Sequence, residues 1–238
     1  VPASSAQQAT WDRRHADPPD SSFMTVWTYD VQGEIDTRAL GTSLSRIVQR
    51  HEVLRTALHV ERGQLVQKVR PPYEVVVSEL DLSMHPEPET AAQAEILAEV
   101  HRPFSLASGP WLRAAVVRLS PERRRLVLSL PHVVYDAWSM DIFYRELSTI
   151  YAGLVRGVPD QLPEPEFQYA DATLWLLAEH DAQHLRDLLY WRPQLAGLGD
   201  RPLFASRTGL VRRGLRQVTR LRTVPLFASG PLAALRRR

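Results

Sequence analysis

The segment with the clearest chemical potential is residues 132–136, which read His-Val-Val-Tyr-Asp. A hydrophobic run containing Leu126, Leu128 and Leu130 precedes it, and a helical pattern follows. A histidine between a strand and a helix start is well placed for catalysis, because neutral imidazole accepts a proton from an attacking hydroxyl or amine near pH 7. The alternative is a buried histidine whose nitrogens bind backbone groups. Taken alone, this His-x-x-x-Asp spacing is weak evidence, since it recurs by chance.

A second pair of candidate residues, His180 and His184, is spaced four residues apart, as metal ligands on one helix face can be. A zinc site needs at least a third ligand, and the surrounding sequence is polar. Two solvated histidines are the better interpretation, and no metal site is expected.

Several kinds of chemistry are excluded by what the chain lacks. It has no GxxxxGK[ST] phosphate loop, no complete GxGxxG and no GxSxG nucleophile motif. It has no cysteine, which excludes disulfides, a thiol nucleophile and cysteine-bound metal.

The elements that position His132 follow from hydrophobic periodicity. A helix capped by Asp36 or Thr37 and a helix capped by Ser139 are expected to flank the sheet. Further helices are predicted at residues 90–100 and 169–191, and strands at residues 23–31, 56–60, 64–69, 73–78, 112–119 and 125–130. This mixture predicts an α/β or α+β fold.

Length and composition describe an ordinary globular chain. It has 238 residues, of which 44% are hydrophobic and 24% charged, without an apolar run long enough to span a membrane. The start at Val1 has neither an initiator methionine nor a signal-peptide pattern. We therefore expect a cytoplasmic piece of a longer polypeptide that does not act at a membrane.

The charge distribution is uneven. Residues 201–238 contain ten arginines and no acid, whereas the first 200 residues carry 19 basic and 27 acidic residues. Nucleic-acid binding is not expected, because the arginine bias runs through the whole chain and the tail offers only Phe204 and Phe227 for stacking.

Five segments in order resemble the motifs of condensation domains of nonribosomal peptide synthetases. Residues 5–11 resemble SxAQxxxW, residues 50–56 resemble RHExLRT, residues 103–113 resemble PFDLxxGPLLR, residues 131–139 resemble HHxxxDGWS, and residues 169–175 resemble YxDYAxW. The order and spacing of all five make the resemblance specific, although it extends only to about Gly197.

The resemblance implies one lobe of the two-lobed fold of the chloramphenicol-acetyltransferase-like superfamily. Residues 1–200 would form the N-terminal lobe, and the Arg-rich residues 201–238 would begin a truncated second lobe. The implied reaction joins a donor acyl group to an acceptor amine, both carried as phosphopantetheine thioesters on peptidyl carrier domains beside an adenylation domain. No cofactor would be bound directly.

By the same resemblance His132 is the catalytic residue, through proton removal from the amine or by positioning it. Asp136 would support the site through an ion pair with Arg55 or Arg113. Trp138 and Ser139 complete the motif, while Pro131 and Ala137 replace a histidine and a glycine of the family pattern.

Two expectations follow from the resemblance, and two alternative functions stay open. Because the tunnel of this family lies between two lobes, the chain alone should be inactive and should expose an apolar face. A degenerate, carrier-docking remnant is one alternative function. A related coenzyme A-dependent O-acyltransferase is the other.

Overall fold

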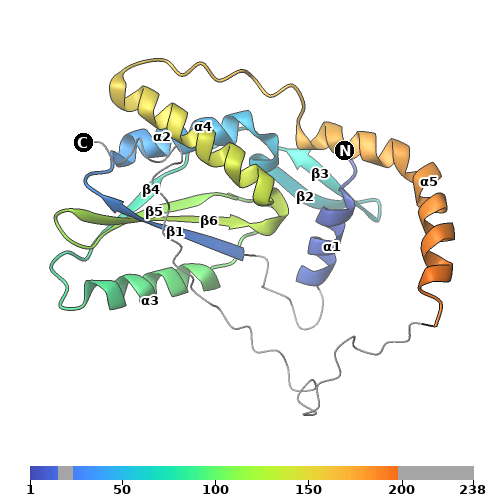
Figure 1. Ribbon diagram of the computed structural model, residues 1–238, viewed down its shortest axis with the longest axis horizontal. Helices are drawn as coiled ribbons and strands as arrows, with labels where there is room; N and C mark the ends of the chain where they lie inside the picture. The colour runs from blue at the N-terminus through green and yellow to red at the C-terminus, as the bar shows by residue number, and fades with distance from the viewer. Residues whose placement is uncertain (16–23, 198–238) are drawn as a thin grey trace, which may run out of the picture.

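A four-stranded mixed sheet with helices on both faces forms the centre of the molecule (Figure 1). The computed structural model describes residues 1–15 and 24–197, so the predicted Arg-rich start of a second lobe lies outside the described residues. The strand order is β1-β6-β5-β4, with β5 and β4 parallel and the other pairs antiparallel. The strands are β1 (Met24–Gln32), β4 (Val77–Asp81), β5 (Arg113–Arg118) and β6 (Arg123–Pro131). The predicted α/β class is therefore confirmed.

Helices α2 (Thr37–Arg50) and α4 (Ala137–Arg156) cover one face of the sheet, and α3 (Pro88–His101) covers the other (Figure 1). The alternation of side chains along β6 explains both layers, because successive residues of a strand point to opposite faces. Leu126, Leu128 and Leu130 belong to the main core beneath α2 and α4, whereas Val127 packs with the α3 side.

Helix α2 forms where its cap and its apolar spacing predict it. The Asp36 side chain accepts a hydrogen bond from the Ala39 amide at 2.8 Å, which satisfies one of the free donors at the helix start. Leu40, Leu44 and Ile47 are buried against the sheet. The one amphipathic face thus fixes how α2 lies on the sheet.

A separate two-stranded hairpin, β2 (Thr56–Glu61) with β3 (Gln64–Val69), follows the short helix η1 (Glu52–Arg55). Helix α1 (Ser5–Arg14) packs beside this hairpin, where Trp11 contacts the small core of Leu58, Leu65 and Leu106. The sequence analysis did not predict α1, because the helix has almost no buried stripe. Its one local signal is the capping box formed by Ser4 and Gln7.

The strand predicted at residues 73–78 begins later, at Val77. Residues 73–76 do not pair with a neighbouring strand, and two of them form hydrogen bonds to η1 and α2 instead. The Tyr73 hydroxyl donates to the Leu54 carbonyl at 3.2 Å, and the Val75 amide donates to Ser45 Oγ at 2.8 Å. Propensity predicted the strand, but these tertiary contacts decide where it begins.

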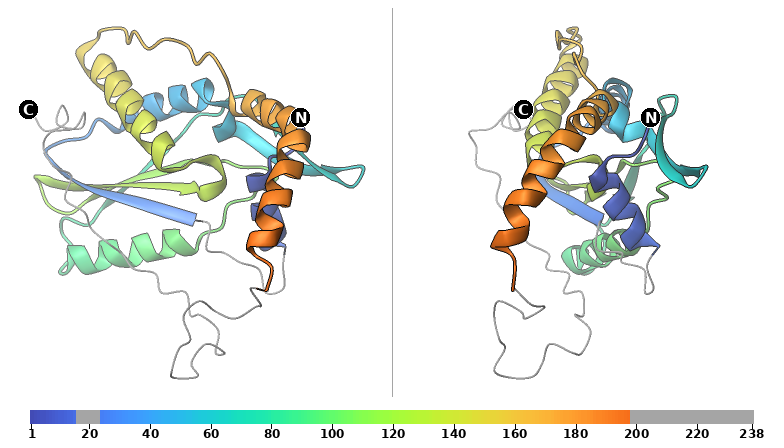
Figure 2. Two further views of the ribbon diagram at one scale, coloured as in Figure 1. Left: turned by 45° about the vertical axis from the view of Figure 1, so that its right-hand side comes forward. Right: turned by 90° about the vertical axis from the view of Figure 1, so that its right-hand side faces the viewer.

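Helix α5 (Tyr169–Gln194) is anchored to the lobe at its first turn and then extends away from the sheet (Figure 2). The side-chain amide of Gln168 donates to the Arg50 carbonyl at 2.9 Å and accepts from the Glu52 backbone N–H at 3.0 Å, and Tyr169 Oη bonds Ser4 Oγ at 2.8 Å. Beyond this anchor the helix carries exposed apolar side chains, with Trp175 65% and Leu189 76% exposed.

Candidate functional site

His132 lies at the point where β6 ends and the chain turns towards α4. A short 3-10 helix, η2 (His132–Val134), makes this turn. Val134 is buried in the main core, and Val133 packs against both the main core and the small core beside α1. With both following residues held inward, the imidazole of His132 is left exposed at the surface. The sequence thus predicted correctly that this histidine lies between a strand end and a helix start.

The ring of His132 stacks on Tyr135, with 5.0 Å between the ring centroids and 28° between the planes. In the part of the chain that the structure describes, no hydrogen bond or ion pair holds this imidazole. Its nitrogens therefore remain available to a substrate. The sequence analysis did not single out Tyr135, although it lies inside the motif.

Asp136 caps α4. Its Oδ1 accepts hydrogen bonds from the Ser139 amide at 2.8 Å and from Ser139 Oγ at 2.6 Å, and the Asp136 amide donates to Ser139 Oγ at 3.3 Å. These bonds, led by that of the Ser139 hydroxyl, lower the pKa of the Asp136 carboxyl below its usual range. The prediction that Ser139 is the cap was wrong by three residues, since Ser139 is the third residue of the helix and completes a capping box.

The predicted ion pair of Asp136 with Arg55 or Arg113 is not formed among the described residues. Arg113 Nε donates to Glu99 at 2.6 Å, and its other nitrogens bind the carbonyls of Pro103 and Arg102. Arg55 donates to the Arg70 carbonyl at 2.7 Å and to Glu52 at 3.4 Å. The expected ion pair is absent because both arginines are bound elsewhere, while the exposed Asp136 accepts the cap hydrogen bonds through its Oδ1.

The two departures from the family motif fit the backbone without strain. Pro131 has φ −76° and ψ 140°, which a proline ring allows, and it lies beyond Ser129, where β5 stops pairing with β6. Ala137 is the first residue of α4, and among the described non-glycine residues only Arg62 has a positive φ. An alanine methyl therefore costs no backbone strain at this position.

Trp138 is 81% exposed, so in this chain it packs little against the lobe. It stands on the first turn of α4, three residues beyond Tyr135 in the chain. The sequence analysis grouped it with the residues that support the site, and the structure places it at the surface.

Arg50, His51 and Glu146 form a largely buried ionic cluster between α2 and α4. His51 Nε2 donates to Glu146 Oε2 at 2.7 Å, and Arg50 Nε lies 3.4 Å from the same oxygen. Burial alone would raise the pKa of Glu146, but the hydrogen bonds from His51 and Arg50 outweigh it and hold the pKa below its usual value. The His of the RHExLRT-like segment thus ties α2 to α4.

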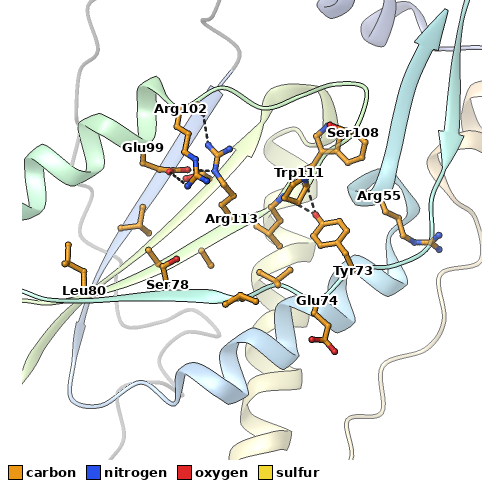
Figure 3. A pocket seen from close by; sticks show the side chains of 18 of the residues that line it. Arg55, Tyr73, Glu74, Ser78, Leu80, Glu99, Arg102, Ser108, Trp111 and Arg113 are labelled. Atoms are coloured by element: carbon orange, nitrogen blue, oxygen red, sulfur yellow. Dashed lines mark hydrogen bonds and ion pairs between the residues drawn. The ribbon is translucent and has the colours of Figure 1, made fainter.

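A cavity of about 850 Å³ lies beside α3 and the β4–β5 edge, and His132 is not among the residues that line it (Figure 3). Tyr73 and Trp111 line one part of this cavity, and the Glu99–Arg113 pair lines another. The Tyr73 hydroxyl accepts hydrogen bonds from the Trp111 and Leu112 amides at 3.0 and 3.2 Å. Because these polar groups already bind one another, we interpret them as residues that stabilise the lobe and not as a ligand-binding site.

No group of three or more potential metal ligands occurs within residues 1–15 and 24–197. Of the histidine pair on α5, the His180 side chain lies outside the described ones. Likewise, over the described residues no helix combines the length and apolarity that crossing a membrane requires.

Comparison with known proteins identifies the family. The family model of the condensation domain matches residues 1–217. A linear gramicidin synthase protein from Brevibacillus parabrevis is 36% identical over 218 residues, which are 87% of this chain and 3% of that protein. Chondramide synthase of Chondromyces crocatus is 32% identical over 248 residues, covering 95% of this chain and 6% of the synthase. The chain thus spans a small part of these large relatives.

Solved structures give the same result for the fold. The first condensation domain of the calcium-dependent antibiotic synthetase is 26% identical, with a TM-score of 0.71 over 82% of this chain and 47% of that one. The X-domain from teicoplanin biosynthesis, at 21% identity, shares the fold with a TM-score of 0.74 over 84% of this chain and 46% of that one. The chain therefore has about half the length of these domains. It belongs to the condensation-domain family of the nonribosomal peptide synthetases.

Proposed function

We propose that this chain is the N-terminal lobe, residues 1–200, of a condensation domain that forms an amide bond between two carrier-bound substrates. In this proposal residues 201–238 begin the second lobe. The observation that carries the proposal is the exposed imidazole of His132 on a turn that the buried Val134 and the partly buried Val133 hold against the core, inside the motif where the family resemblance puts the catalytic histidine.

In the proposed reaction the acceptor amine attacks the carbonyl carbon of the donor thioester. The new C–N bond forms, the C–S bond breaks, and the donor thiol is released on its own phosphopantetheine arm. His132 either takes the proton that the amine loses or holds the amine by a hydrogen bond. A thioester already has a good leaving group, so correct placement of the amine supplies a large part of the acceleration.

The remaining motif residues act through the shape of the turn. The Asp136–Ser139 capping box fixes the start of α4 and, with it, the end of the turn that carries His132. Arg55 supports the lobe further away, because its bond to the Arg70 carbonyl holds the end of the β2–β3 hairpin against η1. Pro131 and Ala137 are compatible with activity, since neither strains its backbone.

The partners in this proposal are a donor and an acceptor peptidyl carrier domain and the adenylation domain of the same synthase. The phosphopantetheine arms enter as parts of the substrates, and no further cofactor takes part. A cytoplasmic location is in keeping with a chain without cysteine.

The test is to supply the complete condensation domain containing this chain with a loaded donor carrier and a loaded acceptor carrier. We expect the lengthened chain on the acceptor arm, detected by mass spectrometry of the intact carriers. An ester formed from an acyl-coenzyme A and an alcohol, without amide product, would favour the O-acyltransferase. No product from any pair of substrates would favour a non-catalytic remnant.

A further inference from the structure

We propose that Tyr135 is a positioning residue that holds the imidazole of His132 in its reactive orientation. This proposal rests on the proposed function of His132. Tyr135 is neither the catalytic residue nor one of the supporting residues of the proposed function. It would act only through the ring of His132.

The backbone of the turn brings the two rings together. In a 3-10 helix the side chains of residues i and i+3 eclipse one another, and η2 begins at His132 and is followed directly by Tyr135. The resulting contact has centroids 5.0 Å apart and planes 28° apart, which lies within the range of stabilising aromatic pairs. A tighter or looser turn would separate the rings.

The core of the lobe holds the Tyr135 side chain in place, and a residue that positions another ring must itself be fixed. Its ring is half-buried against the main core and makes an edge contact with Trp27 of β1, with 6.5 Å between centroids and 69° between planes. Burial raises the pKa of the Tyr135 hydroxyl above its usual value. The phenol therefore stays neutral at physiological pH and serves as a surface, without taking or giving a proton.

The stack gives the imidazole its orientation because nothing else among the described residues does. The exposed ring of His132 makes no hydrogen bond or ion pair there that would fix its rotation about the Cβ–Cγ bond. The neighbouring aromatic residue of the motif, Trp138, is 81% exposed on α4 and cannot replace Tyr135 as a packed support. Loss of the stack should let the imidazole sample unproductive rotamers.

The first experiment reads the ring orientation directly by NMR of the full chain with labelled histidine, assigned with His132→Gln. Stacking on Tyr135 should displace the His132 ring-proton signals upfield. The displacement should persist in Tyr135→Phe and vanish in Tyr135→Leu. Unchanged His132 signals in Tyr135→Leu would overturn the proposal.

The second experiment measures condensation by the complete domain. Tyr135→Leu should lower kcat roughly three- to tenfold, the size of one stacking contact, with little change in KM for either carrier. Tyr135→Phe should stay within about twofold of the wild-type rate. The matched control is Tyr144→Leu, which removes another half-buried tyrosine of the same core, one whose hydroxyl bonds Tyr29 and whose ring contacts Tyr29 and Phe143.

Three results would contradict the proposal: an unchanged kcat in Tyr135→Leu, an equal loss in Tyr135→Phe, or an equal loss in Tyr144→Leu. An unchanged kcat in Tyr135→Leu would mean that Tyr135 does not position His132. An equal loss in Tyr135→Phe would assign the effect to the hydroxyl, and an equal loss in Tyr144→Leu would assign it to a general change in the fold. Full activity without the His132 imidazole would instead overturn the proposed function, and the NMR result would stand independently of it.

Discussion

Replacing Glu146 by alanine tests how the buried ionic cluster holds α2 against α4. The Glu146 side chain is only 8% exposed, and its carboxylate accepts from His51 at 2.7 Å and lies 3.4 Å from Arg50 Nε. A hydrogen bond to a charged group contributes about 1.5–3 kcal/mol. The longer Arg50 contact adds less, because Arg50 Nη2 also donates to the Pro163 carbonyl at 2.6 Å and keeps that partner.

The Glu146→Ala change should therefore lower the free energy of unfolding by about 2–4 kcal/mol at pH 7. For a chain of this size that corresponds to a Tm lower by roughly 4–16 °C in a thermal melt followed by tryptophan fluorescence. The matched control is Glu164→Ala, which removes the other carboxylate beside Arg50 but one that is 85% exposed. It should cost at most about 1 kcal/mol.

The same pair of variants predicts a pH dependence. Because the folded pKa of Glu146 lies below its ordinary value, its stabilising contribution is present above about pH 4.3 and is lost as the pH falls through the lowered folded pKa. The difference in stability between wild type and Glu146→Ala should thus be full at pH 7 and shrink below about pH 4. Equal melts of the two proteins at pH 7, or an equal loss in Glu164→Ala, would refute this account of the cluster.

Three further predictions follow from the site and from α5. Asp136→Ala should cost about 0.5–2 kcal/mol of stability through the lost helix cap, while Asp136→Asn, which still accepts the Ser139 bonds, should cost less. Urea titrations measure both, and equal losses would mean that the negative charge of Asp136, and not its hydrogen-bond acceptor, stabilises the fold. His51→Ala should lower Tm by less than Glu146→Ala, because Glu146 keeps Arg50, and a larger drop would mean that the histidine has another role. Residues 1–238 alone should form no dipeptidyl carrier above spontaneous aminolysis and should associate on a sizing column through the exposed apolar residues of α5; a clean monomer would contradict the second part.

Local signals predicted most of the elements. Asp36 with Leu40, Leu44 and Ile47 describes α2 from its cap to its buried face, because capping and amphipathic spacing are properties of a short segment. The apolar alternation of β6 likewise placed His132 at a strand end. Helix α1 was missed because only its Ser4–Gln7 capping box, and not its hydrophobic pattern, marks it.

What the sequence could not predict depends on contacts between distant segments. The ion pair of Asp136 was predicted from the family resemblance, yet Glu99 and Glu52 already bind the two arginines, and Ser139 lies nearer to Asp136 in the chain. The contact of Tyr135 with His132 depends on the 3-10 turn, which has no reliable signal of its own.

The most direct test of the central claim compares His132→Ala and His132→Gln with wild type in the complete domain, in single-turnover assays with both carriers loaded. Loss of amide formation in both variants is the expected result if the imidazole takes the proton, and partial activity in the glutamine variant alone is expected if it positions the amine by a hydrogen bond. Wild-type rates in the alanine variant would contradict the assignment of His132 as the catalytic residue.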